Sequence, residues 1–298
     1  MPLDPVETLG RLVEIPSVNP MGGTVSGPEF GEARLTDHLQ SLCQDSGFRC
    51  WRQHVHPQRD NLIARLDGQI DPRKGGKLIL FGVHQDTVPV GGMTIEPWNP
   101  AVRGGRLYGR GACDVKGGMA AMIAAIARLA DERPNGMPTI VLACTVNEEY
   151  GFSGASALRR LLDGQEAGII PRKPDAAVVA EPTDLDVVVA HKGVVRWRCH
   201  ARGRAGHSAL PEQGDNAIYK MARALRVLEG YQREGVATLG SHPLCGPATM
   251  SVGTIRGGIS VNTIPAQCTI EIDRRLPPGE EPGQAYRHLV DHLERKGG

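Results

Sequence analysis

Three runs of successive apolar residues, in the first two thirds of the chain, predict buried strands. They cover Leu78–Val83, Thr139–Val146 and Asp175–Ala180. Apolar residues on successive positions are typical of strands that are buried on both faces of a sheet. Segments 116–131 and 153–163 lie between successive runs and carry apolar residues at helical spacing. Strands that alternate with helices predict an α/β fold with a sheet between helices.

One helix and two further strands are predicted upstream of these runs. Apolar residues at helical spacing begin at Ala33 and end before Gly47, a residue type that often ends helices. Strand-like runs follow at Phe48–Val55 and Leu62–Leu66. We assign all of these elements to a first domain, over residues 1–191.

The pattern changes near residue 192, which predicts a second domain over residues 192–298. An alternating strand at Val194–Ala201 precedes a helix around Ala217–Leu228. Strands at Ala248–Ile255 and Thr263–Asp273 then precede a final helix. Strands and helices in this order are typical of a small α+β domain.

Composition and charge narrow the classes of function. The 298-residue chain is 40% hydrophobic, has a formal net charge of +1 and contains no long run of Lys or Arg. We therefore expect neither a nucleic-acid partner nor a membrane surface as partner. The seven cysteines form no C-x-x-C pair, and the N-terminus lacks the apolar core of a signal peptide. With an apolar stretch at 119–130 that is too short to span a bilayer, these features predict a soluble cytoplasmic protein.

A histidine and several acidic residues directly follow the three apolar runs. His84 and Asp86 come after the first run, Glu148 and Glu149 after the second, and Glu181 after the third. The ligand crevice of an open α/β sheet lies at the carboxyl ends of its strands. We therefore expect these side chains at one rim of the sheet.

Asp114 lies between two glycine clusters, Gly109–Gly111 and Gly117–Gly118, at the start of a predicted helix. Glycines let the backbone turn tightly, so that a carboxylate between them can be aimed at a partner. The sequence contains no G-x-x-x-x-G-K-[ST] motif, which weakens the alternative interpretation as a phosphate-binding loop. Asp114 is expected on the same rim.

One histidine and several carboxylates without a thiolate are typical of a site for a hard or borderline divalent ion, foremost zinc. Asp114 can bridge two such ions, which at about 3.5–4 Å apart activate a water molecule for attack on a carbonyl group. Glu148 and Glu149 offer one ligand and one general base. Asp86 can accept the second ring N–H of His84 and so fix its tautomer.

In order and spacing, four motifs resemble those of the M20 family of dinuclear zinc amidohydrolases and peptidases. They are H-Q-D at 84–86, G-R-G-x-x-D-V-K-G-G at 109–118, E-E-Y-G at 148–151 and E-P at 181–182. The resemblance implies that His84 and Glu181 bind one zinc ion, Glu149 the other, and that Asp114 bridges both. It also implies that Glu148 is the general base and that a cis peptide follows Asp114.

The same resemblance implies an architecture. The catalytic domain has a central mixed β-sheet between helices, and an inserted α+β lid, ferredoxin-like, pairs two subunits. In the lid, His207 matches a residue that reaches the partner subunit's active site and stabilises the oxyanion. Asn262 and Arg275 match residues that hold a substrate carboxylate, and the planar guanidinium of Arg275 suits that role independently.

The protein expected from this resemblance is a homodimeric amidohydrolase or peptidase. Each subunit holds two Zn2+ ions, or Co2+ in their place. A zinc-activated water, with Glu148 as base, cleaves the amide bond of an N-acyl amino acid or a small peptide. The family includes acetylornithine deacetylase, succinyl-diaminopimelate desuccinylase, aminoacylases and glutamate carboxypeptidases.

The sequence departs from the family pattern in three places. Val83 and Asn147 stand where glycine and an acid are common, and both changes are tolerable. In the family, the chain returns from the lid and supplies a last His ligand to the ion held by Glu149, whereas this sequence ends at Gly298. The alternative is therefore a catalytically incomplete fragment, or a non-catalytic dimeric protein that binds zinc or another ligand.

His288 and His292 are spaced i, i+4 on the last predicted helix, a spacing that can bind a metal ion. Neither follows a predicted strand, and no third ligand is near in the sequence. We interpret them as part of a solvated helix face rather than as substitutes for the last His ligand.

Overall fold

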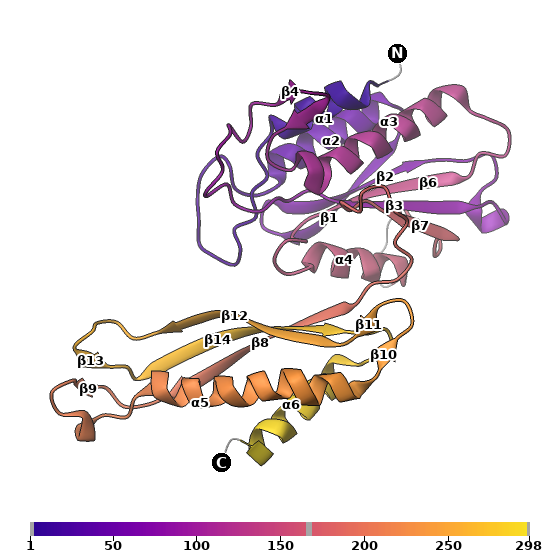
Figure 1. Ribbon diagram of the computed structural model, residues 1–298. Coiled ribbons are helices and arrows are strands. Elements are labelled where there is room, and N and C mark those ends of the chain that lie inside the picture. Colours follow the sequence, from indigo (N-terminus) through magenta and orange to yellow (C-terminus); the bar gives the residue numbers. More distant parts are fainter. Residues whose placement is uncertain (1–2, 165–168, 297–298) are drawn as a thin grey trace. The chain divides into compact units, whose positions relative to one another are not determined.

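The computed structural model of the chain describes residues 3–164 and 169–296. The chain divides into two compact units, Met1–Leu185 and Asp186–Gly298 (Figure 1). Each has a hydrophobic core of its own. The first unit contains the motifs that follow the apolar runs, and the second corresponds to the predicted α+β region. In the described part of the chain, no helix is long and apolar enough to cross a membrane.

A mixed five-stranded sheet forms the centre of the first unit. Its strands lie in the order β1 (Arg49–His56), β2 (Arg59–Leu66), β6 (Thr139–Thr145), β3 (Leu78–His84) and β7 (Ala176–Val179). Strand β3 is parallel to β6 and to β7, whereas β2 is antiparallel to β1 and to β6. Because β3, β6 and β7 are parallel, their carboxyl ends lie at the same rim of the sheet, as expected from the sequence.

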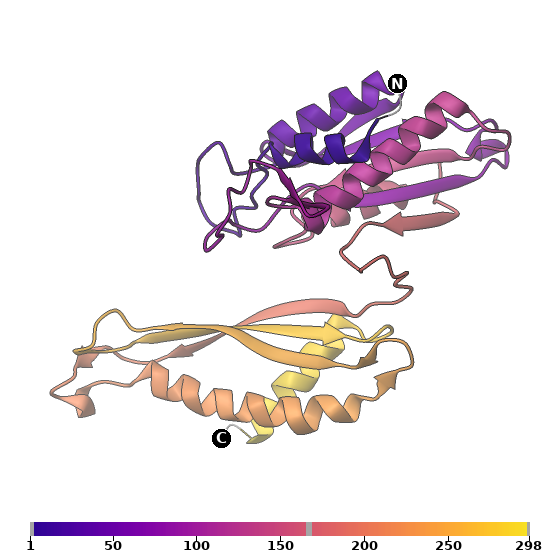
Figure 2. The same ribbon diagram turned by 45° about the horizontal axis from the view of Figure 1, so that its top comes forward.

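Helices cover both faces of this sheet (Figure 1 and Figure 2). Those on one face are α1 (Pro5–Val13), α2 (Ala33–Asp45) and α3 (Gly117–Glu132), and α4 (Ser153–Leu162) lies on the other. Leu39 and Ile123 are buried in the core of the first face with Leu142. Leu158 packs with Val141 in the core of the second face. The predicted helices α2, α3 and α4 are confirmed.

Helix α1 was not predicted from the sequence. Its start is fixed by Asp4, whose side chain accepts two backbone N–H groups of the first turn, and by Pro5 at the first helical position. Leu12 and Val13 at its other end are fully buried. The Asp-Pro start is a local capping signal that is independent of the spacing of apolar residues.

The prediction that the third apolar run is buried on both faces is wrong. All four residues of β7 are exposed, including Val178 and Val179, whereas every residue of β6 is buried. Among the described residues only β3 pairs with β7, so β7 is an edge strand. An apolar run predicts a strand, but whether both faces and edges are covered depends on its neighbours in space.

An antiparallel three-stranded sheet, covered on one face by two helices, forms the second unit (Figure 2). Its elements are the strands β12 (Thr249–Gly257), β14 (Gln267–Leu276) and β8 (Gly193–Arg202), in that order, and the helices α5 (Ala217–Gly230) and α6 (Pro282–Lys296). The predicted strand at 263–273 is divided at Pro265 into β13 (Thr263–Ile264) and β14, because β13 pairs with β9 (Gly206–His207) instead. The α+β architecture predicted for this region is confirmed.

Several short elements complete the fold. They are the hairpin strands β4 (Ala101–Arg103) and β5 (Arg106–Tyr108), the paired strands β10 (Ser241–His242) and β11 (Gly246–Pro247), and the short turns η1 (Pro72–Lys74), η2 (Ala112–Lys116), η3 (Pro211–Gln213), η4 (Tyr231–Gly235) and η5 (Val236–Leu239). Of these, only η2 carries a predicted metal ligand, Asp114.

Candidate metal centre

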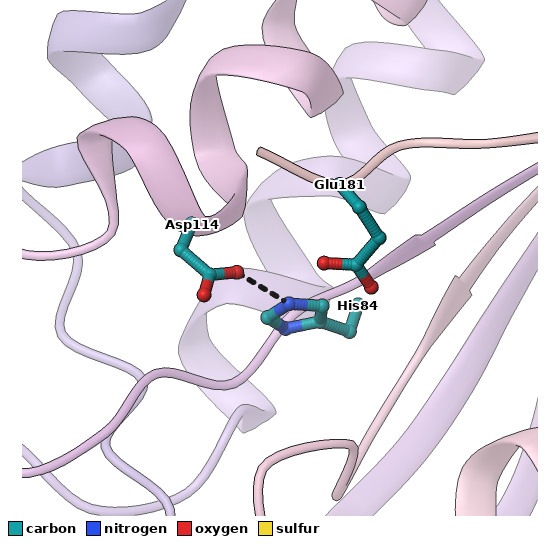
Figure 3. Close-up of side chains that lie close together, drawn as sticks. All are labelled: His84, Asp114 and Glu181. Atoms are coloured by element: carbon teal, nitrogen blue, oxygen red, sulfur yellow. Dashed lines mark hydrogen bonds and ion pairs between the residues drawn. The ribbon is translucent and has the colours of Figure 1, made fainter. Parts of the chain in front are cut away.

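Three predicted metal ligands from separate elements converge in the first unit. His84 is the last residue of β3, Asp114 lies in η2 directly before α3, and Glu181 follows β7. The Nε2 atom of His84 lies 3.0 Å from Oδ1 of Asp114, and ligand atoms of all three residues lie within 4.8 Å of one another. Figure 3 shows both carboxylates turned toward the imidazole. One nitrogen donor and two oxygen donors for a metal ion therefore lie together at this rim of the sheet.

Close backbone contacts shape the loop that carries Asp114. Gly111 has a φ of 78°, a left-handed conformation that favours glycine. A Cβ atom on Gly117 would lie 2.6 Å from the carbonyl oxygen of Ala112, so that a larger residue would force the loop to move. The peptide bond between Asp114 and Val115 is cis, as the resemblance implied.

Lys116 ties this loop to the N-terminal helix. The side chain is buried, and Nζ donates hydrogen bonds to the carbonyl oxygens of Leu12 at 2.9 Å and Ile15 at 2.7 Å. Burial lowers the pKa of Lys116 to about 7. Because the carbonyl groups at the end of a helix have no partner within that helix, these contacts stabilise the end of α1 as well as the loop.

Asp86 contacts the site differently from the prediction. The Nδ1 atom of His84 lies 2.9 Å from the main-chain carbonyl oxygen of Asp86, and 3.8 Å from its carboxylate. The acceptor for the ring N–H is therefore the main chain. The carboxylate instead accepts the backbone N–H groups of Glu148 and Glu149, both at 3.0 Å, and the side-chain amide of Asn19 at 2.7 Å.

Glu148 and Glu149 lie in the turn that follows β6. Asn147, which precedes them, has a φ of 62°, a conformation that asparagine adopts more readily than most residues. This preference is a physical reason for Asn147 at a position where the family pattern commonly has an acid. Glu149 is not part of the three-residue cluster, but it lies near enough to Asp114 for their charges to interact.

The charges of the site shift several pKa values. Burial alone would lower the pKa of His84, but the hydrogen bond to Asp114 and the surrounding carboxylates outweigh burial and raise it to about 9. The same hydrogen bond lowers the pKa of Asp114. Burial, together with the charge of Asp114, raises the pKa of Glu149 to about 7, and burial raises that of Glu181. In the absence of a metal ion, His84 and Glu149 therefore bind protons more readily than free side chains do.

The donor set fits divalent metal ions. Imidazole nitrogen and carboxylate oxygen are ligands that zinc and related ions accept. Burial first, and then the charge of Asp114, raises the pKa of Glu149, and a bound cation would favour the charged form of both carboxylates. These side chains can therefore bind a divalent metal ion once His84 and Glu149 have lost their protons.

Comparisons with known proteins identify the family. The model of the peptidase dimerisation domain, M20_dimer, matches residues 189–298, and that of peptidase family M28 matches residues 61–236. Succinyl-diaminopimelate desuccinylase of Rhodospirillum centenum is 31% identical, over 99% of this chain and 73% of that protein. The chain belongs to the M20 family. Acetylornithine deacetylase of Myxococcus xanthus is 34% identical, and there the aligned part covers 86% of this chain but only 64% of the deacetylase.

Solved structures share the M20 fold with this chain. The M20 family metallo-carboxypeptidase Sso-CP2 of Sulfolobus solfataricus has a TM-score of 0.76 at 18% identity, over 99% of this chain and 76% of that structure. The Bacillus subtilis protein YXEP, a dinuclear metal-binding peptidase of the M20 family, has a TM-score of 0.58 at 18% identity, over 98% of this chain and 70% of that structure. At this level of identity the likeness concerns the fold.

In this M20 chain, two of the three predicted lid residues lie together. His207 pairs with Thr263 in the short β9–β13 ladder, and the backbone N–H of Ser208 donates to the carbonyl oxygen of Asn262 at 3.0 Å. Arg275 lies near the other end of β14, where its Nε donates to Asp273 at 2.7 Å. The eight residue-to-residue steps from Gln267 to Arg275 span roughly 27 Å of strand. Within the second unit of one chain, Arg275 is therefore far from the other two residues.

The histidines on α6 pack against Tyr231. The Tyr231 hydroxyl lies 2.8 Å from Nδ1 of His288, and the rings of Tyr231 and His292 are 4.9 Å apart between centroids. Both histidines are half-buried, so that the interpretation as a solvated face is wrong. Tyr231 comes from the segment after α5, a contact that the spacing on α6 alone does not predict. Neither histidine belongs to the metal cluster found among the described residues.

Polar residues behind the rim of the sheet were not predicted from the sequence. Asn19 and Glu32 are buried and contact Asp86 and Asn147, respectively. Glu32 also receives two hydrogen bonds of 2.6 Å from Arg59. Polar residues in irregular segments have no periodicity that reveals burial. The only local sign is that Asn19 precedes a proline in a segment without helical or alternating spacing.

Proposed function

We propose that this M20 chain hydrolyses the amide bond of N-acyl amino acids or small peptides in a metal-dependent reaction. The convergence of His84, Asp114 and Glu181 at the sheet edge is the observation that carries the proposal. Relatives named as a succinyl-diaminopimelate desuccinylase and an acetylornithine deacetylase support the choice of an N-acyl amino acid. A structural neighbour that is a metallo-carboxypeptidase supports small peptides as the second class.

The proposed ions are two Zn2+, or Co2+ in their place. His84 and Glu181 would hold one ion and Glu149 the other, with Asp114 as the shared ligand. When bound, the ions polarise the amide carbonyl and lower the pKa of a water molecule. The main-chain oxygen of Asp86 accepts the Nδ1 proton of His84 and thereby leaves Nε2 to face Asp114, a supporting contact typical of metal-ligating histidines.

Glu148 is the proposed general base. Its carboxylate takes a proton from the attacking water, whose oxygen forms a bond to the amide carbon, and delivers that proton to the nitrogen as the C–N bond breaks. Asp86 holds the backbone N–H groups of Glu148 and Glu149 at 3.0 Å each. These two hydrogen bonds fix the backbone positions from which the two side chains extend. They thereby support separate roles for the two adjacent glutamates.

The proposed assembly is a homodimer through the dimerisation domain at residues 189–298. His207 of one subunit would stabilise the oxyanion in the other subunit's site. Asn262 and Arg275 would hold the substrate carboxylate, for which Arg275 offers a planar guanidinium. The separation of Arg275 from His207 and Asn262 within one lid supports a site that draws on the lids of two subunits.

A substrate panel tests the proposal. The chain is loaded with zinc, its metal content is measured, and N-acetyl amino acids, N-succinyl amino acids and dipeptides are offered at neutral pH. Release of a free amino group from one of these classes, lost on chelation and restored by zinc, is the expected result. A folded chain that holds two zinc ions and cleaves no member of the panel would overturn the proposal.

A further inference from the structure

The turn that carries Glu148 and Glu149 is held by a buried polar network that reaches to the N-terminal part of the chain. The backbone N–H groups of the two glutamates donate to Oδ1 and Oδ2 of Asp86, respectively. The backbone N–H of Asn147 donates to Glu32 at 3.2 Å. The position of the turn thus depends on how the Asp86 carboxylate is oriented.

Asn19 is the residue that joins Asp86 to the turn from behind. Its Nδ2 donates to Oδ2 of Asp86 at 2.7 Å and to Oδ1 of Asn147 at 3.0 Å. Its Oδ1 accepts the backbone N–H of Met21 at 2.8 Å. Both N–H bonds of the amide are therefore used, and the side chain, which is 1% exposed, has a single orientation that satisfies all three contacts.

The Asp86 carboxylate is itself 1% exposed, so that it depends on N–H donors rather than on water. Three donors contact it, namely the amide of Asn19 and the two backbone N–H groups of the turn. Removal of the amide of Asn19 leaves the carboxylate with fewer donors and frees it to rotate. Asn147 loses a partner at the same time, so both supports of the turn weaken together.

We propose that Asn19 is a positioning residue that sets the Glu148–Glu149 turn through Asp86 and Asn147. Both N–H groups of the Asn19 amide are donated to Asp86 and Asn147, so Asn19 acts on the turn through these two residues. This role rests on the proposed function of Glu148 as base. It assigns to a residue of the N-terminal segment the alignment of the proton-transferring group.

Hydrogen exchange measures this role without metal or substrate. In Asn19→Ala, the backbone amides of Glu148 and Glu149 should exchange at least about tenfold faster than in the wild type, because their acceptor is no longer held. Amides in β6 and β14 should keep their rates. Thr139→Val is the matched control, since Thr139 is also 1% exposed and accepts a hydrogen bond at the other end of β6.

Kinetics provide the second readout. The kcat of Asn19→Ala should fall about 10–100-fold, while its KM stays within about threefold, since Asn19 acts through other residues on an aligned base. Asn19→Leu keeps the approximate shape of the side chain, removes the amide donor without adding a charge beside Asp86, and serves if the alanine variant does not fold. Unchanged amide exchange and unchanged kcat in a folded variant would overturn the role of Asn19. A wild-type chain that cleaves no substrate would defeat the proposed function instead, and the exchange experiment would still judge Asn19.

Discussion

The Nε2 atom of His84 lies 3.0 Å from Oδ1 of Asp114, and the two groups share a proton. The pKa of His84 is raised to about 9 and that of Asp114 is lowered, so that at neutral pH an imidazolium faces a carboxylate. A metal ligand must be unprotonated. The proton between the two residues therefore occupies the place that an ion would take.

Zinc binding is accordingly expected to release protons. At pH 7, filling the site should release roughly 1–2 protons per chain, one from His84 and a fraction from Glu149, whose pKa is about 7. Calorimetric titrations with zinc, in buffers that differ in ionisation enthalpy, give this number. His84→Asn should release fewer protons and bind more weakly. Zinc binding without any proton release would contradict the pairing of His84 with Asp114.

Glu148 and Glu149 are expected to respond differently to the same substitution. Glu148→Gln should keep the metal content of the wild type and lower kcat at least about 100-fold, because an amide cannot accept the proton. Glu149→Gln should lose bound metal. Metal analysis of the purified variants, paired with kinetics, separates the two roles. Loss of zinc from Glu148→Gln would reverse the assignment of the pair.

The rim of the site was predictable because the end of an apolar run marks the end of a strand. The apolar runs before His84 and Glu148 correspond to β3 and β6, and parallel pairing brings their ends to one edge. The loop around Asp114 was marked by its glycines. Each of these signals lies within a few successive residues, so the sequence alone is sufficient to predict it.

The parts that were not predicted depend on contacts between distant segments. The exposure of β7 follows from its place at the sheet edge, which its composition does not encode. Asp86 binds the turn of Glu148 through its carboxylate and His84 through its main-chain oxygen. Which group of Asp86 contacts which partner depends on the folded backbone and is not encoded in the spacing of these residues. Asn19 lies 67 positions from Asp86 in the sequence, and no periodicity connects them.

Asp175 should make the stability of the first unit depend on pH in acid. The backbone N–H of Leu78 and the guanidinium of Arg172 hold the pKa of Asp175 at about 2, below its ordinary 3.8. The unfolded chain therefore binds the proton first, and the stability that Asp175 contributes is present above pH 3.8 and is lost as the pH falls toward 2. Asp175→Asn should be less stable than the wild type at pH 7.

Urea unfolding at pH values from 7 to 3 measures this effect. The difference in free energy of unfolding between wild type and Asp175→Asn should stay constant down to about pH 4 and then narrow. A difference that widens as the pH falls would mean that the pKa of Asp175 is raised in the folded chain rather than lowered.

Gly154 lets α4 approach the end of β6, which leads into the Glu148–Glu149 turn. A Cβ atom there would lie 2.2 Å from the carbonyl oxygen of Val146, a backbone atom that cannot move aside without moving the turn. Gly154→Ala should therefore destabilise the chain by about 1–3 kcal/mol. Gly230→Ala is the control, because Gly230 ends α5 with open space around it. That change should alter the free energy of unfolding by less than about 1 kcal/mol, toward higher stability.

The last prediction concerns which subunit supplies His207. His207→Ala chains and Glu148→Gln chains are each expected to be nearly inactive alone. If His207 acts in the partner subunit's site, a mixed dimer contains one site with both groups intact. Random pairing of equal amounts makes half of all dimers mixed, so the mixture should recover about one quarter of wild-type activity. If His207 acts in its own subunit, no site has both groups, and the mixture stays as inactive as its parts.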